Sequence, residues 1–236
     1  MPVNIDTVYQ RVLALANKEQ RGYITPQEYN LLANQAQSLI FEQYFYDLDK
    51  ALETHANNTE YSDRTKEIQE RIAPFENNNV NTASVSGNAI TLPTDLHRLG
   101  TVFYINNGQN VKVERVDANE VEMMQQTALY AATQSRPVYV RRSDTIIDLY
   151  PSSLTYLTTT VKCNYIEKPT QVVWGYTVVN NQALYNAAAS TNFSLHAAEE
   201  IDLVYKILEM AGIVLNKPGL VQIATNEETG LIAKKQ

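Results

Sequence analysis

The chain has 236 residues, of which 44% are hydrophobic and 19% charged, and its formal net charge is −7. This length allows one large or two small globular domains with a real core. No stretch approaches the ~20 apolar residues of a membrane helix, and the N-terminus lacks the basic and apolar regions of a signal peptide, so we expect neither. Residues 1–75, 76–178 and 179–236 carry 7, 8 and 4 basic side chains against 11, 9 and 6 acidic ones. Because no segment is basic, tight binding to nucleic acid is disfavoured.

The first third of the chain shows the apolar spacing of three helices. We expect them over about Asp6–Asn17, Pro26–Thr54 and Asp63–Ala73, with Pro74 ending the third. The second helix is roughly 29 residues and ~43 Å long, more than most globular helices. It should therefore cross a whole domain or pack against a neighbouring subunit.

The start of this long helix carries a capping box. Thr25 can accept a hydrogen bond from the third helical amide, and Glu28 can reach back to the Thr25 amide. Pro26 fits the first helical position, where no amide hydrogen is needed.

From residue 76 the pattern changes to the alternation of strands. Hairpin turns are expected at Gly87-Asn88, at Asn106-Asn107-Gly108 and near Arg142-Ser143-Asp144, and "TTTVKCNYIEKP" predicts a further strand that contains Cys163. Asp117 is expected to cap a short helix between the second and third hairpins. Six or seven short strands in this order predict an antiparallel β-sandwich or barrel of about 100 residues.

Helices return at the C-terminal end. One is expected to start at Asn192 or Ser194 and to stop at Gly212, and the last residues, "LIAKKQ", are expected to form a free or docking arm. The fold class is therefore α+β, with an N-terminal helical part at 1–75, a β domain at 76–178 and a C-terminal helical part at 179–236. Because helical parts flank the β segment, we expect them to pack as one domain into which the β domain is inserted.

Residues suited to catalysis or metal binding are sparse. The three histidines, His55, His97 and His196, lie in different segments without a ligand partner at metal-binding spacing. No glycine-rich phosphate loop and no G-x-S-x-G motif occurs. Cys163 is expected to be a small strand residue, because nothing nearby in the sequence lowers a thiol pKa. We therefore expect no catalytic residue, no cofactor and no metal, and interpret the chain as a non-enzyme.

Aromatic residues offer candidates for contact with other proteins. The sequence has 15 Tyr against 5 Phe and 1 Trp, and tyrosine is enriched at interfaces as well as in half-buried sheets. Trp174 either fills the seam between the β part and the C-terminal helices or anchors a partner. Our candidate interface residues are Trp174, Tyr176 and Tyr185, together with Leu231 and Ile232 of the C-terminal arm.

Two stretches of the chain have a distinctive wording. The first is "LANKEQRGYITPQEYNLLANQAQSLIFEQYF" (15–45), and the second is "YIEKPTQVVWGY…ALYNAAASTNFSLHAAEEIDLVYKILEMAGI" (165–213). Both resemble virion ring proteins of crAss-like bacteriophages. The resemblance implies a head-to-tail connector or adaptor, a dodecameric ring beneath the portal with helices in the ring and a β domain projecting outward. It implies as partners further copies of the chain, the portal and other tail or ring proteins, in a virion assembled in the host cytoplasm. Active-site residues are not part of the resemblance.

The ring interpretation fits the charge. Roughly twelve chains would together carry a formal charge of about −84, and an acidic lumen would let DNA pass without specific binding. Two other classes compete with it. A glycan- or receptor-binding tail module would bind its ligand through the β domain and its tyrosines. A hydrolase would need a carboxylate pair such as Asp144 and Asp148.

Overall fold

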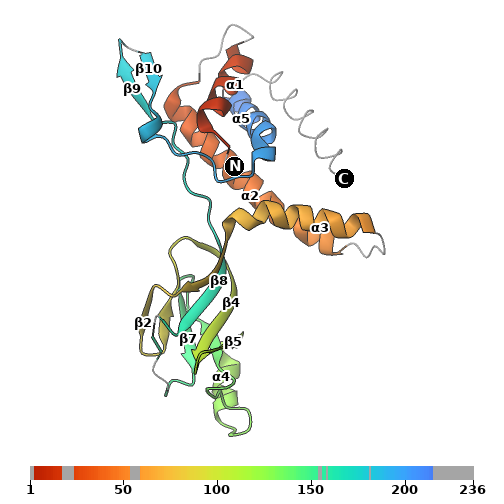
Figure 1. Cartoon of the computed structure of the whole chain (residues 1–236), viewed down its shortest axis with the longest axis vertical. Coiled ribbons are helices and arrows are strands. Elements are labelled where there is room, and N and C mark those ends of the chain that lie inside the picture. The colour runs from red at the N-terminus through yellow and green to blue at the C-terminus, as the bar shows by residue number, and fades with distance from the viewer. Residues whose placement is uncertain are drawn as a thin grey trace. The chain divides into compact units, whose positions relative to one another are not determined.

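The computed structural model describes residues 3–17, 24–53, 59–153, 156–157, 159–180 and 182–214. The chain divides into two compact units (Figure 1). The helical unit comprises Met1–Pro74 and Pro169–Gln236, and the β unit comprises Phe75–Lys168. The presence of several helices and one large sheet confirms the expected mixed α+β class.

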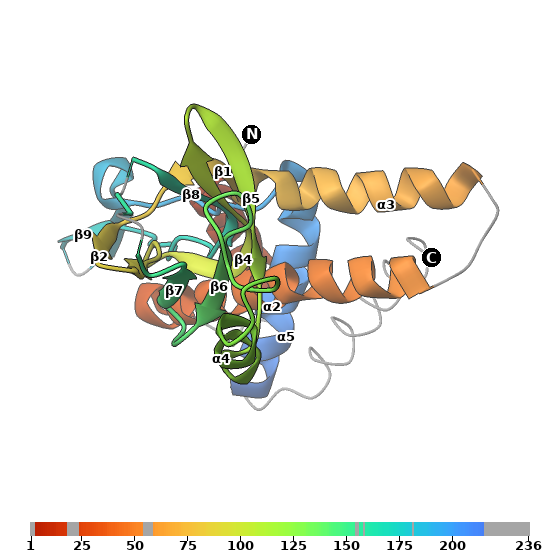
Figure 2. The ribbon, with the colours of Figure 1, turned by 90° about the horizontal axis from the view of Figure 1, so that it is seen from below.

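The helical unit is built on α-helices that pack side by side, with short 3-10 turns and one separate hairpin. Its elements are α1 (Ile5–Asn17), α2 (Pro26–Glu53), α3 (Thr59–Ile72), β9 (Tyr176–Val179), β10 (Gln182–Tyr185), η2 (Ala187–Ala189), η3 (Ala197–Glu199) and α5 (Glu200–Val214), while η1 (Ala73–Phe75) leads into the β unit. Helix α5 packs against both α1 and α2. Figure 2 shows α2 and α3 running side by side in opposite directions.

The capping box at the start of α2 is confirmed. The Thr25 amide donates to Glu28 Oε2 at 2.9 Å, and the Glu28 amide donates to Thr25 Oγ1 at 3.3 Å. The hydrogen bonds that the Thr25 amide and the Thr25 hydroxyl donate to Glu28 Oε2 lower the pKa of the Glu28 carboxyl. Pro26 is the first residue of the helix, which spans 28 residues and is therefore about 42 Å long.

The core of the helical unit is broader than the apolar spacing of α2 predicts. The spacing predicts an apolar face made of Tyr29, Leu32, Ala33, Ala36, Leu39, Ile40, Phe45, Leu48 and Leu52. Phe41 and Tyr44, outside this face, are 2% and 4% exposed, whereas Leu39, inside it, is 44% exposed. The reason is that α2 is covered on two sides, by α5 and by the extended segment that follows Pro169. A one-sided amphipathic pattern cannot describe such a helix.

The β unit is a single sheet of eight strands in the order β1-β8-β4-β5-β6-β7-β3-β2. Its elements are β1 (Glu76–Asn81), β2 (Ser84–Ser86), β3 (Ala89–Thr91), β4 (Leu96–Asn106), β5 (Gln109–Arg115), α4 (Ala118–Gln125), β6 (Val138–Arg141), β7 (Ile146–Tyr150) and β8 (Val161–Glu167). The three predicted hairpin turns are all present. Gly87, Asn107 and Gly108 have the positive φ angles of 64°, 49° and 80° that such turns need.

The sheet is curled, and its two end strands follow each other in the chain. Strands β1 and β2 are the two ends of the order, yet only Thr82 and Ala83 separate them in the chain. The Thr82 amide donates to Val161 O next to β1, and the Ala83 amide donates to Thr91 O next to β2. The concave side holds the core, whose buried members are Ile90, Leu92, Leu96, Val102, Tyr104, Val113, Tyr139, Ile147, Leu149, Tyr156, Val161, Cys163 and Tyr165.

Three expectations need correction. The sheet is not wholly antiparallel, because α4 and the turns after it carry the chain back so that β6 runs parallel to β5. The C-terminal helix begins at Glu200 and not at Asn192 or Ser194, because residues 191–195 form an extended segment. Asp117 occupies the N-cap of α4, but its side chain makes no capping hydrogen bond.

Candidate interaction surface

Amide side chains on one flank of α2 hold an extended segment of chain. Asn30 Oδ1 accepts from the Trp174 amide at 2.7 Å, and Asn30 Nδ2 donates to Trp174 O at 3.3 Å. One turn later, Asn34 Oδ1 accepts from the Val172 amide at 2.9 Å and Nδ2 donates to Val172 O at 2.8 Å. Four helical residues rise about 6 Å and two strand residues about 6.6 Å, so the spacings match. The two asparagines thus take the place of a neighbouring strand.

Gln37 continues this amide ladder and ties in a second segment. Its Nε2 donates to Thr170 O at 2.8 Å, and its Oε1 accepts from the Ser194 amide at 3.0 Å. Gln37 is buried, so both of its polar ends are used where water cannot replace them. The ladder therefore fixes the chain on both sides of the β9–β10 hairpin.

Trp174 is the centre of an aromatic cluster. Its ring centroid lies 4.5 Å from that of Tyr9 on α1, 5.9 Å from that of Tyr176 and 5.7 Å from that of Tyr185. Its Nε1 donates to Asp6 Oδ1 at 2.9 Å. The base of the hairpin, where Tyr176 and Tyr185 face each other across the strands, is thereby anchored on α1.

Gly175 lets the chain pass from the ladder into the hairpin. A Cβ atom at this position would lie 2.5 Å from the backbone oxygen of Ala189 in η2. The Gly175 amide donates to Ser190 Oγ at 2.9 Å, and Gly175 O accepts from the Asn186 amide at 2.9 Å. Only glycine fits this close crossing without a backbone shift.

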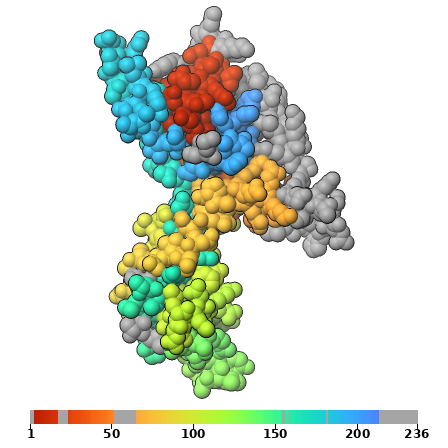
Figure 3. Space-filling model, viewed as in Figure 1, coloured from red at the N-terminus to blue at the C-terminus, as the bar shows by residue number. Residues whose placement is uncertain are grey.

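The β9–β10 hairpin exposes apolar side chains on both of its faces. Val178 shares one face with Tyr176 and Tyr185, while Val179 and Leu184 lie on the other. Val178, Val179 and Leu184 are 65%, 48% and 50% exposed. In Figure 3 the hairpin stands out from the helical unit beside α1. Exposed apolar groups that gather on one element are typical of an interaction site.

Charge is absent from the whole hairpin region. Residues 169–195 contain no Asp, Glu, Lys or Arg, which makes this the longest uncharged run of a chain that is 19% charged. Exposed strand edges are commonly protected by charged side chains, lysine above all. This hairpin lacks that protection.

The structure brings three of the five predicted interface residues together and leaves two untested. Trp174, Tyr176 and Tyr185 belong to one cluster, whereas Leu231 and Ile232 lie outside the described residues. Trp174 is 3% exposed and packs on α1 within the helical unit, so it is not an exposed anchor. It acts as the support of the exposed hairpin.

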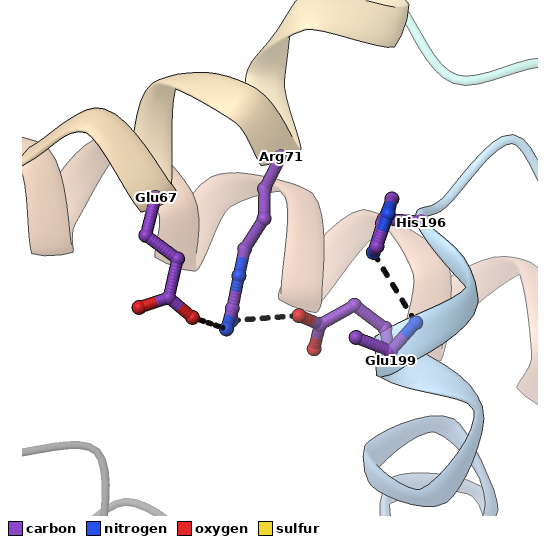
Figure 4. A network of polar contacts seen from close by, with 5 residues as sticks. Glu67, Arg71, His196 and Glu199 are labelled. Atoms are coloured by element: carbon purple, nitrogen blue, oxygen red, sulfur yellow. Dashed lines mark hydrogen bonds and ion pairs between the residues drawn. The ribbon is translucent and has the colours of Figure 1, made fainter. Parts of the chain in front are cut away.

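A partly buried ion pair joins α3 to η3, the short turn that leads into α5 (Figure 4). Arg71 donates to Glu199 Oε1 at 2.7 Å and to Glu67 Oε1 at 2.6 Å. Burial by itself lowers the pKa of Arg71, but attraction to Glu199 and the hydrogen bond to Glu67 more than offset this, so the pKa is raised. His196 Nδ1 accepts from the Ala198 amide at 3.3 Å and caps η3.

The two carboxylates considered for hydrolase chemistry have quite different surroundings from each other. Asp144 is fully exposed in its turn, whereas Asp148 is 7% exposed in β7 and pairs through Oδ2 with Arg142 at 2.7 Å. Cys163 is a buried free thiol, as the strand pattern predicts. Burial, followed by the nearby Asp95 carboxylate, raises the pKa of Cys163 to about 11.

Metal binding and membrane insertion find no support in the residues that the structure describes. Within them, no group of three or more His, Cys, Asp or Glu side chains is placed to hold a metal ion. Across the same residues, no helix is both long and apolar enough to span a bilayer.

Sequence reasoning missed the ladder residues Asn30, Asn34 and Gln37 and the hairpin itself. The ladder has a spacing of four and then three residues on a helix, but a polar face of that kind is usually solvated. The hairpin has a clearer signal, because Asn180-Asn181 separates two β-prone runs and Asn180 has a φ of 50°.

A comparison with known protein families and with curated proteins finds no match for this chain.

Proposed function

We propose that the chain is a non-enzymatic structural protein of a bacteriophage virion, a connector that closes into a ring of roughly twelve copies and joins the portal to the tail. The resemblance of residues 15–45 and 165–213 to virion ring proteins supports this. The observation that carries the proposal is the exposed, uncharged β9–β10 hairpin held rigidly on the helical unit. An exposed apolar surface of this kind is typical of a protein that functions in contact with another protein.

The proposed ring assigns different tasks to the two units. We propose that the helical parts form one ring-building domain and that the β domain is an insertion that projects from it. The division of the chain into Met1–Pro74 with Pro169–Gln236 on one side and Phe75–Lys168 on the other supports this arrangement. The ladder supports it too, since it ties residues 170–174 to α2 although more than 130 positions separate them in sequence.

The negative charge of each copy bears on how DNA would pass through the proposed ring. Each copy carries a net charge of −7, so an assembled ring repels duplex DNA wherever its acidic side chains face the lumen. We propose passage of DNA without specific binding. The assembled protein should then leave a labelled duplex unretarded in a gel at about 0.1 M salt. Retention of the duplex would contradict this part of the proposal.

The test of the function is the mass of the particle in solution. Light scattering after size exclusion should be run on the purified chain alone and mixed with the portal protein of the same phage. Ring closure predicts a species near 320 kDa, about twelve times the 26.6 kDa chain, in at least one sample. A 26.6 kDa monomer that ignores the portal would refute it.

A further inference from the structure

The β9–β10 hairpin is incomplete as an isolated element. Among the described residues, β9 and β10 pair only with each other. The backbone amide and carbonyl groups on the outer edge of each strand therefore face no further strand. A two-stranded hairpin is marginal in water unless one face packs on a core. Here only the base, at Tyr176 and Tyr185, packs on Trp174, and the aliphatic tip is exposed on both faces.

A second uncharged apolar surface lies on α2. The exposed members, here called the α2 flank, are Leu31, Gln35 and Leu39, and the two leucines are 71% and 44% exposed. Residues 29–41 contain no charged side chain. Glu28 precedes Leu31 by three residues and Glu42 follows Leu39 by three, so the α2 flank is a neutral surface between two carboxylates on the same side of the helix.

The α2 flank and the hairpin lie on different sides of the helical unit. At about 100° per residue, the α2 flank is centred roughly 135° around the helix from the ladder residues Asn30, Asn34 and Gln37. The ladder leads directly into the hairpin through Trp174. One copy therefore cannot cover its own α2 flank with its own hairpin, but it can offer each surface to a different neighbour.

Charge favours a second copy of this chain as the occupant of both surfaces. Two copies at −7 each repel one another, and this repulsion is weakest where both surfaces are neutral. A basic partner would instead be drawn to the acidic parts of the surface. Contact between two unlike patches of identical chains is heterologous, which is the geometry that generates rings.

We propose that the β9–β10 hairpin of one copy packs on the α2 flank of the next copy, and that this contact repeats around the ring. The inference rests on the proposed function and specifies its subunit contact. Val178, on the face that it shares with Tyr176 and Tyr185, supplies the aliphatic contact of the hairpin, and Leu31 and Leu39 receive it.

Cysteine cross-linking tests the contact directly. The only native cysteine, Cys163, is buried, so introduced cysteines are the reactive ones. Full-length Val178→Cys and Leu31→Cys chains, purified separately, are mixed and treated with a short bis-maleimide. The proposal predicts covalent dimers in the mixture, at least tenfold more than in either chain alone. Met123→Cys replaces Leu31→Cys in the control, because Met123 is 70% exposed and lies on α4 of the β unit.

The outcomes separate the contact from the ring. Dimers in the Val178→Cys chain alone would mean that hairpins pair with themselves, which overturns the proposal. A ring-sized particle without cross-links between the two variants overturns the contact and leaves the proposed function standing. A monomer without cross-links at high concentration, with or without the portal, overturns both.

A charge variant gives a second measurement. Val178→Asp should lower the assembled fraction at least tenfold, because a carboxylate would be buried against an apolar helix. Circular dichroism and a melting curve keep a folding defect apart from an assembly defect. Met123→Asp is the matched control and should assemble like the unmodified chain. Equal assembly of all three proteins contradicts the contact.

Discussion

At the residue scale, several polar side chains in the described part of the helical unit bind two partners at once. Arg71 shows this best, because one guanidinium serves a buried carboxylate and an exposed one. The Glu199 side chain is 2% exposed, whereas that of Glu67 is 62% exposed. The pair with buried Glu199 should therefore contribute more to the free energy of folding than the pair with exposed Glu67.

Removing the two carboxylates one at a time tests that statement. Glu199→Ala leaves a partly buried cation short of its main partner and should lower the free energy of unfolding by about 2–4 kcal/mol. Glu67→Ala is the matched control on the same guanidinium and should cost less than about 1 kcal/mol. Urea denaturation measures both. Equal losses would contradict the assignment of Glu199 as the dominant partner.

The raised pKa of Cys163 predicts a loss of folding stability at alkaline pH. Its pKa is raised to about 11 in the folded chain, so the unfolded chain loses its proton first, and the contribution to stability disappears as pH rises from about 9 to about 11. The loss should be on the order of 2 kcal/mol over this range. In the Cys163→Ala variant, the free energy of unfolding should fall by about 2 kcal/mol less over the same pH range. Parallel curves for the two proteins would contradict a buried neutral thiol.

At the scale of elements, local patterns predicted what local chemistry decides. The capping box of Thr25 and Glu28, the turn at Asn107-Gly108 and the strand around Cys163 all depend on neighbours within a few residues, and each is confirmed. The amide ladder depends on a segment more than 130 residues away, so nothing in the sequence of α2 marks Asn34 as a hydrogen-bond partner of distant backbone. The parallel pairing of β5 with β6 likewise could not be predicted from local patterns, because it depends on where α4 and the following turns return the chain.

The ladder can be tested at its central rung. Asn34→Ala leaves the amide and carbonyl of Val172 without their partner at a partly buried site, which should cost about 2–3 kcal/mol. Gln35→Ala, the exposed neighbour, should change stability by less than about 0.5 kcal/mol. Hydrogen exchange of the Val172 amide should accelerate in Asn34→Ala alone. An unchanged rate would show that the ladder does not hold the segment.

At the scale of the whole molecule, the proposed assembly combines an acidic chain with neutral contact surfaces. Net charge keeps copies apart at long range, while the hairpin and the α2 flank offer contact at short range without ion pairs. This combination predicts an unusual sign for the effect of salt on assembly.

Salt should promote ring formation. Raising the ionic strength from about 0.05 M to about 0.5 M shortens the screening length from roughly 14 Å to roughly 4 Å, which weakens the repulsion between copies. The assembled fraction at a fixed concentration should rise several-fold, as measured by light scattering. Dissociation of the particle by salt would mean that ion pairs hold the copies together.

The most direct test of the central claim is to image the assembled protein by electron microscopy and determine its rotational symmetry. The account predicts closed rings in which every subunit makes the same head-to-tail contact, so that particles seen along the axis have about twelvefold symmetry. Two-fold dimers, open filaments, or isolated monomers in the presence of the portal would contradict it.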